Sequence, residues 1–338
     1  MRYSIDDEAS EQKHRPVSVS RQRGFSRQSE KTRVAVGAIT YRRPEGLKRL
    51  VDGLSRLVFR KSDPPDLEIV VVDNDPSGLA CAFCEAIRSD LDWPLRCFIE
   101  PRRGISHARN RVVACTVENV DFIAFIDDDE VPEPYWLDEL LYVQRLHDAD
   151  VVAGPVPPYF PEPISSWVES GDFFEWDRYP TGHRLEHAHT GNVLIRSAVF
   201  KSMDKIFDER FALSGGEDTH FFMRVHRAGY SIVWANDALV REWIPKSRTN
   251  MKWILMRAFR GGLIYSVCEL ELDPSMTVRV RRVVRASGRI VLGLLLVPLS
   301  AATGRHRLVE ALQHVALGVG ALTGVAGRFY EEYRKPTR

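Results

Sequence analysis

Short apolar runs alternate with helix-like segments along the first half of the chain, and this alternation limits the possible folds more than any other feature. The runs at 33–40 (RVAVGAIT), 67–72 (LEIVVV) and 122–126 (FIAFI) have the length and continuous apolar character of strands buried in a parallel sheet. Helices are expected between them, notably at 79–89 and 105–117. Strands alternating with helices predict right-handed βαβ units, so we expect an α/β fold with a doubly wound, mostly parallel sheet.

Charge is balanced in total but unevenly distributed. The 338 residues carry 47 Lys and Arg against 46 Asp and Glu, which gives a formal net charge of +1. Because a nucleic-acid-binding protein normally has a strong basic excess, we expect no nucleic-acid partner. Residues 1–31 combine basic residues with Ser and Gln and few apolar residues, which predicts a disordered basic arm. Five arginines and no acid lie between 277 and 289.

Three consecutive aspartates, Asp127, Asp128 and Asp129, follow the apolar run at 122–126 directly. They are therefore expected at the carboxyl end of a strand, where open α/β sheets bind ligands. Neighbouring carboxylates repel one another unless a cation neutralises them. Such oxygen ligands suit Mg²⁺ or Mn²⁺ that also holds phosphate groups, although a solvated acidic turn is the alternative.

Polar residues follow the other strands at equivalent places. Thr40 and Asp73 come after the first and second runs, where each would either line the same crevice or cap a turn. The segment 102–110 (RRGISHARN) places Arg103 and Arg109 before and within the start of a helix. Arginines and helix-terminal N–H groups suit a diphosphate, and the alternative is surface solvation of that helix.

A second acidic motif, SGGED, begins at Ser214. Its two glycines permit a tight turn, after which Glu217 and Asp218 begin a helix. A carboxylate placed there can accept a proton from an attacking hydroxyl group. Acids in the first turn of a helix also compensate its dipole, so the motif alone leaves both interpretations open.

The order of these motifs resembles the family 2 glycosyltransferases, which have the GT-A fold and use nucleotide-sugar donors. The resemblance covers roughly residues 33–262. It rests on AITYRR, IVVVDND, RRGISHARN, FIDDDEVPEPYWL, GPVPP, HTGNVLIR and SGGEDTHFFMRVHRAGY. Within the family the chain is most similar to bacterial exopolysaccharide transferases of the succinoglycan type, especially in ALVREWIPKSRTNMKWILMRAFRGG.

This resemblance implies an inverting glycosyltransferase with a nucleotide-sugar donor, expected to be a UDP-sugar. The acceptor would be a saccharide hydroxyl, expected on a lipid-linked saccharide, in exopolysaccharide or cell-surface glycan synthesis. One alternative is a nucleotidyltransferase of similar fold, although the sequence has no GxxxxGK[ST] loop. The other is a relative that binds a glycan or partner without catalysis.

The resemblance also assigns roles in donor and metal binding. Donor binding is expected of Thr40, Asp73, Arg103, Arg109, Asp127 and Asp128, with Asp73 reading the base. Asp127 and Asp129 form the DxD pair expected to bind Mn²⁺ or Mg²⁺. Many relatives have a metal-binding histidine where this chain has Glu242, which is therefore either a metal ligand or an ion-pair partner.

For catalysis, the resemblance implies that Asp218 is the general base that deprotonates the acceptor. Glu217 would orient the acceptor, and Thr190-Gly191-Asn192 would line the donor or acceptor pocket. The DxD and GGED motifs together are specific to the superfamily and do not specify a sugar.

Beyond residue 246 the chain is expected to be helical. The uncharged stretches 290–304 and 311–327 fall at or below the length needed to span a bilayer, and the arginines ahead of them suit anionic headgroups. We expect a peripheral contact with the cytoplasmic face of the inner membrane, with a soluble helical hairpin or an oligomer contact as the alternative. The expected domains are the arm, 32–262 (nucleotide half 32–153, acceptor half 154–262) and a helical region 263–338.

Five cysteines and no recognisable secretory signal predict a reduced, cytosolic protein. Cys81 and Cys84 form a CxxC motif, but no second pair or histidines follow at zinc-finger spacing. We therefore expect these two side chains to be small buried groups on a helix.

Overall fold

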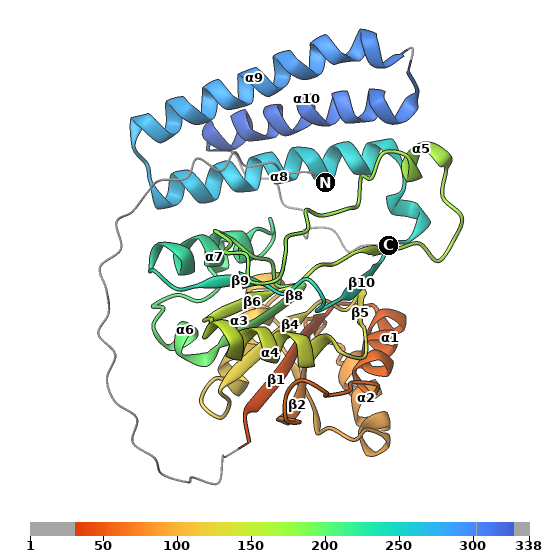
Figure 1. Cartoon of the computed structure of the whole chain (residues 1–338), viewed down its shortest axis with the longest axis vertical. Coiled ribbons are helices and arrows are strands. Elements are labelled where there is room, and N and C mark those ends of the chain that lie inside the picture. The colour runs from red at the N-terminus through yellow and green to blue at the C-terminus, as the bar shows by residue number, and fades with distance from the viewer. Residues whose placement is uncertain (1–30, 302, 328–338) are drawn as a thin grey trace.

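The structure, a computed structural model, describes residues 31–301 and 303–327 (Figure 1). The predicted basic arm falls almost entirely on residues 1–30, outside the described residues. The rest of the chain forms an α/β domain below a layer of three long helices (Figure 1).

The domain is built on a seven-stranded sheet in the order β3-β2-β1-β4-β8-β6-β9. Its strands are β1 (Arg33–Thr40), β2 (Asp66–Asp73), β3 (Leu95–Ile99), β4 (Phe122–Ile126), β6 (Val151–Ala153), β8 (Asn192–Arg196) and β9 (Ile232–Trp234). All neighbouring pairs are parallel except those of β8, which runs antiparallel to β4 and β6. The doubly wound, mostly parallel sheet expected from the alternating runs is confirmed.

Helices cover both faces of the sheet, and an apolar core lies under each layer. Leu47 of α1 and Leu140 of α4 pack on one face, and Val112 of α3 and Phe221 of α7 pack on the other. The α-helices of this domain are α1 (Pro44–Leu54), α2 (Leu79–Ile87), α3 (Ile105–Thr116), α4 (Trp136–His147), α5 (Ser166–Glu169), α6 (Ser197–Lys201) and α7 (Glu217–Arg227). Short 3-10 helices are η1 (Arg88–Asp90), η2 (Glu209–Phe211) and η3 (Lys246–Arg248).

A small second sheet, in the order β5-β10-β7, lies next to the end of β4 and was not predicted. It consists of β5 (Glu130–Pro132), β10 (Val240–Trp243) and β7 (Pro158–Tyr159). Strands of two to four residues are too short to show an apolar pattern, and β7 falls in a proline-rich segment expected to be a loop. This sheet matters because it brings the chain around residue 242 beside the acidic cluster.

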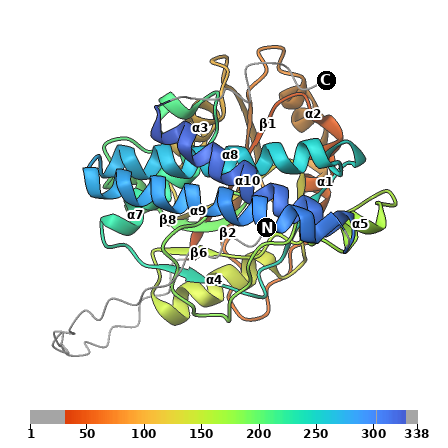
Figure 2. The same cartoon turned by 90° about the horizontal axis from the view of Figure 1, so that it is seen from above.

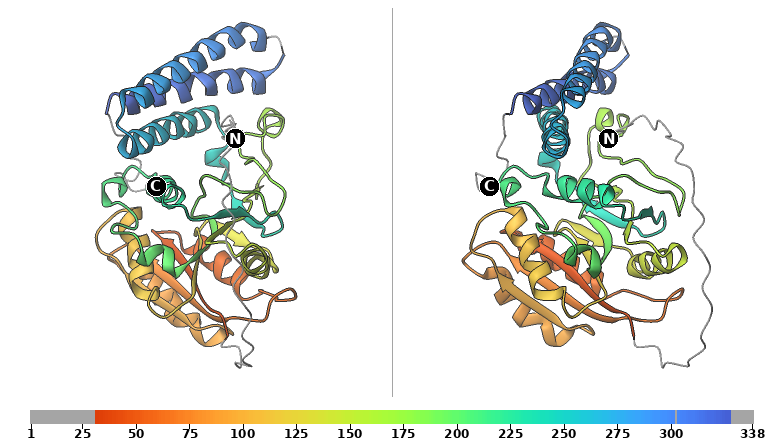
Figure 3. Two further views of the ribbon diagram at one scale, coloured as in Figure 1. Left: turned by 60° about the vertical axis from the view of Figure 1, so that its left-hand side comes forward. Right: turned by 90° about the vertical axis from the view of Figure 1, so that its left-hand side faces the viewer.

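Three helices, α8 (Met251–Leu272), α9 (Met276–Ala301) and α10 (Arg305–Val325), form the layer above the domain. Seen from above they cross over the sheet (Figure 2), and the side views show α8 nearest to the catalytic domain and α9 farthest from it (Figure 3). Helices α8 and α10 approach closely, since a Cβ on Gly262 would meet Leu317 O and one on Gly320 would meet Phe259 O. The expected domain boundary at residue 262 lies inside the continuous helix α8.

The expectation of reduced cysteines is wrong for one pair. Cys81 of α2 forms a disulfide with Cys97 of β3, and their Cα atoms are 5.2 Å apart. Cys84 is buried on the same helix, as expected. The pair is separated by 16 residues and meets only because α2 packs against β3, which the CxxC spacing does not reveal.

Candidate active site

The carboxyl ends of β1 and β4 join two of the predicted site residues. Thr40, the last residue of β1, donates its hydroxyl hydrogen bond to Asp128 Oδ2 at 2.7 Å. Asp128 is buried, and its other oxygen accepts a hydrogen bond from Arg43 at 2.8 Å. Asp128 therefore points into the protein and fixes the loops that follow the two strands.

Asp73, at the end of β2, is buried and hydrogen-bonded within its own turn. Its two oxygens accept hydrogen bonds from the N–H groups of Asp75 and Ala80, each at 2.9 Å. It therefore caps the turn into α2, which was one of the two interpretations left open by the sequence. Its reading of a nucleotide base stays a prediction.

Asp129 faces outward, where arginines surround it. Its Oδ2 accepts a hydrogen bond from Arg43 at 3.0 Å and lies 3.1 Å from an Arg248 nitrogen. Beside it is a cavity of about 310 Å³, which we call the four-arginine pocket. It is lined chiefly by Arg42, Arg43, Arg49, Arg248, Asp129 and Trp243. The volume and charge of this pocket suit a multiply charged anion next to Asp129.

Arg109 connects the two acidic motifs. Its side chain is only 3% exposed, and it donates to Asp127 Oδ1 at 2.9 Å and to Glu217 through its other terminal nitrogen. Asp127 and Glu217 are 90 residues apart in sequence and belong to different faces of the fold. The predicted Arg109 is thus in the site, with its guanidinium occupied by carboxylates, and its contact with a diphosphate stays a prediction.

The GGED turn places Glu217 and Asp218 at the first turn of α7. Gly215 and Gly216 have φ of +75° and +91°, and a Cβ on Gly216 would collide with Ile264 of α8. Only glycine therefore fits this turn between α7 and α8. Asp218 Oδ1 accepts a hydrogen bond from the N–H of Thr219 at 2.6 Å.

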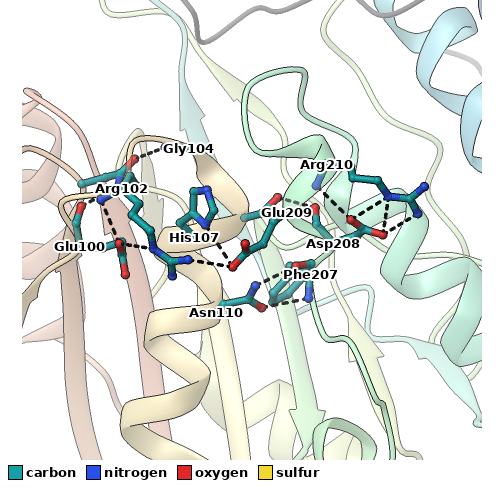
Figure 4. A network of polar contacts seen from close by, with 11 residues as sticks. Glu100, Arg102, Gly104, His107, Asn110, Phe207, Asp208, Glu209 and Arg210 are labelled. Atoms are coloured by element: carbon teal, nitrogen blue, oxygen red, sulfur yellow. Dashed lines mark hydrogen bonds and ion pairs between the residues drawn. The ribbon is translucent and has the colours of Figure 1, made fainter.

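A polar network fixes the segment that leads into this turn (Figure 4). Asn110 of α3 exchanges two hydrogen bonds with the backbone of Phe207, at 2.8 and 3.0 Å. Arg102 and His107 both contact Glu209, at 3.2 and 3.3 Å. The segment 102–110 therefore acts at least in part as the support for the acidic turn.

Burial perturbs the acids of the crevice in opposite directions. Burial raises the pKa of Asp128 to about 6 and that of Glu217 to about 7, despite the nearby arginines. Burial also raises the pKa of Asp127, Glu130 and Glu242. For Asp218, burial is outweighed by His189, Arg109 and the Thr219 N–H, so its pKa lies well below the usual range. Asp218 is thus a stable carboxylate amid acids that lack sufficient counter-charge.

Glu242 reaches the acidic cluster through the small sheet. It pairs with Glu130 across β5 and β10, and the N–H of Trp243 donates to Asp129 O at 2.7 Å. Glu242 Oε1 lies 3.5 Å from Arg248, so it is an ion-pair partner in this structure. Its role as a metal ligand stays a prediction.

A divalent cation can be weighed against these side chains. Over residues 31–301 and 303–327, no group of three or more His, Cys, Asp or Glu side chains is arranged to hold a metal ion. Mg²⁺-type sites in nucleotide enzymes, however, use only one or two carboxylates together with substrate phosphates. Asp127 and Asp129, in a cluster with raised pKa values, fit that simpler arrangement.

The predicted TGN segment is partly structural. The Asn192 amide donates to Pro155 O and Ala238 O at 2.9 and 2.7 Å. A Cβ on Gly191 would collide with the Glu130 carboxylate. The Thr190 hydroxyl is buried without a hydrogen-bond partner. These residues hold the wall of the crevice.

Other site residues were missed or only half seen in the sequence. Arg103 lies over the Tyr41 ring at 5.2 Å, at the edge of the crevice as predicted. Arg43 carries the ion pairs with Asp128 and Asp129, and its signal was the AITYRR motif. His189 lies 3.6 Å from Asp218 Oδ2 and was adjacent to the quoted TGN motif.

Comparison with known proteins follows the same line. Residues 36–211 match the family described as glycosyl transferase family 2. The chain is 33% identical over 236 residues to succinoglycan biosynthesis protein ExoM of Rhizobium meliloti (strain 1021), covering 69% of this chain and 74% of that protein. It is 23% identical over 259 residues to glucosyl-dolichyl phosphate glucuronosyltransferase of Haloferax volcanii, covering 71% and 78%.

Among solved structures, the chain is similar to mannosyltransferase PcManGT from Pyrobaculum calidifontis in complex with GDP-Man and Mn²⁺. The TM-score is 0.59 at 15% identity, with 89% of each chain covered, so this likeness concerns the fold. A GT-A glycosyltransferase fold with two acidic motifs facing one crevice is the class that the structure defines. The chain belongs to glycosyl transferase family 2.

Proposed function

We propose that this glycosyltransferase moves a sugar from a UDP-sugar to a hydroxyl group of a lipid-linked saccharide, with inversion at the anomeric carbon. The observation that carries the proposal is the bridge from Asp127 through Arg109 to Glu217. It brings the motif expected to hold the donor beside the motif expected to deprotonate the acceptor. A single crevice can then hold both substrates in reacting geometry.

The four-arginine pocket supports a donor with a diphosphate group. Arg43 and Arg248 contact Asp129 in the protein alone, and both can turn to phosphate oxygens when a donor is present. The guanidinium groups would then stabilise the charge that develops on the departing nucleoside diphosphate.

Asp127 and Asp129 would hold Mn²⁺ or Mg²⁺ together with the donor phosphates, and Glu242 is a candidate third ligand. A bound divalent cation would supply Lewis-acid stabilisation of the leaving diphosphate. Replacing Asp129 with Ala should weaken metal-dependent binding of UDP, measured by titration calorimetry with and without Mn²⁺. UDP binding that is equally tight and equally metal-dependent in that variant would contradict the assignment.

Asp218 is the proposed general base. Its side chain is 20% exposed, so it faces the crevice, whereas Glu217 beside it is buried against Arg109. Removal of the acceptor proton allows the acceptor oxygen to attack the anomeric carbon opposite the leaving group. One displacement inverts the configuration, so an α-linked donor gives a β-linked product.

The names of the relatives support a role in surface polysaccharide synthesis on a lipid carrier. The one from Rhizobium meliloti is a succinoglycan biosynthesis protein, and the one from Haloferax volcanii acts on a glucosyl-dolichyl phosphate. Transfer to a lipid-linked saccharide in exopolysaccharide synthesis would explain both. It would also require the enzyme to work at a membrane.

The outer helices support such a contact. By length and composition, Met276–Ser300 and Arg305–Val325 could each cross a membrane, with mean hydropathies of 1.6 and 1.4, although core helices of soluble proteins pass the same test. The α9 segment exposes several apolar side chains next to its arginines. We propose that this face rests on anionic lipids at the cytoplasmic side of the inner membrane.

The proposal is tested by incubating the full chain with UDP-glucose, UDP-galactose, UDP-glucuronic acid, UDP-N-acetylglucosamine and GDP-mannose, with and without Mn²⁺. A membrane extract provides lipid-linked acceptors. Release of UDP together with a labelled lipid-linked product is expected. Release of pyrophosphate from a nucleoside triphosphate and a sugar phosphate would indicate a nucleotidyltransferase instead. Binding of donors with no release of any kind would indicate a non-catalytic protein.

A further inference from the structure

His189 lies at the mouth of the crevice, immediately before the wall formed by Thr190, Gly191 and Asn192. Its Nδ1 is 3.6 Å from Asp218 Oδ2, and its side chain is 42% exposed. The imidazole therefore touches the proposed base on one side and solvent on the other. Neither the family resemblance nor the comparisons assign a role to it.

The orientation of Asp218 does not depend on His189. Asp218 Oδ1 is already held by the Thr219 N–H at 2.6 Å, which leaves Oδ2 facing the imidazole. The imidazole is itself held in place, because the Trp176 ring packs on it with centroids 4.8 Å apart. The backbone is fixed three residues later by the Asn192 side chain. This geometry suits proton transfer better than a purely structural contact.

The charged groups around His189 come from three elements. Asp218 faces it from α7, with Glu217 and the Arg109 of α3 beyond. His187 of the same segment lies with its ring centroid 5.9 Å away. From α8, Arg257 packs against Trp176 at 5.2 Å. Asp218, whose pKa is held low, retains an extra proton poorly, so a proton taken from the acceptor has to move on.

We propose, building on the transferase function above, that His189 is a second proton-transfer residue that takes the acceptor proton from Asp218 and releases one to solvent. The acceptor O–H bond breaks, and its electron pair forms the bond to the anomeric carbon. The bond from that carbon to the diphosphate oxygen breaks, and its electron pair leaves with the diphosphate. The proton passes through Asp218 Oδ2 to Nδ1 of the neutral imidazole, while the proton on Nε2 goes to water. Exchange with water then restores the starting tautomer.

The pH dependence of turnover tests this role. The neutral imidazole is the proton acceptor, so activity is lost as the pH falls and His189 becomes protonated. His189→Gln should lower kcat by about 100-fold, leave KM for the donor unchanged and remove the acid limb of the kcat profile. His183→Gln is the matched control, because His183 lies in the same segment but stacks on Tyr179. The assay uses whichever donor of the panel above releases its nucleoside diphosphate.

Two outcomes would overturn the proposal. One is an unchanged kcat in His189→Gln. The other is a lower kcat with the same acid limb, since the pKa of Glu217 is raised to about 7 by burial and that group would then own the limb.

A measurement without turnover separates this proposal from the proposed function. In protein with ¹⁵N-labelled histidine, the Nδ1 signal of His189, assigned with His189→Gln, should shift when Asp218 is replaced by Asn. An unchanged signal would show that the two side chains are not coupled, whatever the enzyme transfers. A wild-type protein in which the signal shifts but no donor releases its nucleoside diphosphate would contradict the transferase function alone.

Discussion

The crevice and the outer face of α9 are both incompletely satisfied by the chain itself, in opposite ways. In the crevice, buried carboxylates outnumber the arginines beside them, and several have raised pKa values. On α9, five arginines lie beside apolar side chains that face solvent. The exposed apolar residues of α9 are Met276, Val280, Val283, Val284, Val291, Leu292, Leu294, Leu295 and Leu299.

This difference indicates two different partners. An excess of buried negative charge suits a cation and the donor that accompanies it. A mixed arginine and apolar face suits a surface that is anionic outside and apolar below, such as a bilayer. Helix α7, which begins with Glu217 and Asp218, packs against α8, and α8 in turn lies below α10 and α9 (Figure 3). The two regions are therefore connected through three helices.

The largest effect should come from breaking the crevice without changing its shape. Asp218→Asn removes the proton acceptor and keeps the size of the side chain, so kcat should fall by about 1,000-fold. Binding of UDP with Mn²⁺ should stay within a factor of about three, measured by calorimetry. Asp92→Asn, at an exposed position of the same domain, is the control. Turnover within tenfold of wild type in Asp218→Asn would remove Asp218 from the mechanism.

The α9 face should respond to charge placed among its apolar residues. Leu295 and Leu299 are 65% and 68% exposed, so replacing both with Asp should leave the fold intact. Binding to phosphatidylglycerol vesicles should weaken by about 100-fold, because each leucine contributes about 1.5 kcal/mol when buried in lipid. Flotation of vesicles measures the bound fraction.

The matched control for the α9 face is Leu146→Asp. Leu146 of α4 is 59% exposed and lies in the α/β domain, away from α9. Equal vesicle binding by the double variant and wild type would show that the apolar face of α9 contacts something other than lipid.

The excess of negative charge in the crevice should appear as a pH dependence of stability. The pKa of Glu217 rises from 4.5 to about 7 on folding, so the folded state binds its proton more tightly. Stability therefore falls as the pH rises through this window, by up to about 3 kcal/mol for this group. In Glu217→Gln this contribution is absent. The difference in unfolding free energy between wild type and Glu217→Gln, from urea titrations at pH 4.5, 6 and 7.5, should shift accordingly. A difference that is constant with pH would contradict the charge imbalance.

The sequence predicted the main sheet well because buried parallel strands produce continuous apolar runs. The runs at 33–40 and 122–126 correspond to β1 and β4 residue for residue. The small sheet was missed because its strands are shorter than any pattern, although it is what brings Glu242 to Asp129.

The members of the site were largely predictable, but their pairing was not. The resemblance named Arg109 and Glu217 separately, as donor and acceptor residues. That they form one ion pair depends on α3 and α7 packing on the same face of the sheet. Likewise, the contact between Arg43 and Asp128 joins residues 85 positions apart, and nothing in either motif indicates the other.

The disulfide between Cys81 and Cys97 lies outside both regions, and so it gives the smallest effect on function and a test of the comparison. Closing a loop of 16 residues should stabilise the fold by at most about 3 kcal/mol, so Cys81→Ser or a reducing agent should lower the urea midpoint. Turnover and vesicle binding should each change less than twofold, because neither the crevice acids nor α9 contact this link. Cys115→Ser, at a free cysteine, is the control. Labelling of both Cys81 and Cys97 by a thiol reagent in the unfolded, unreduced protein would show that the link does not form in the protein as isolated, and the expectation of reduced cysteines would then stand.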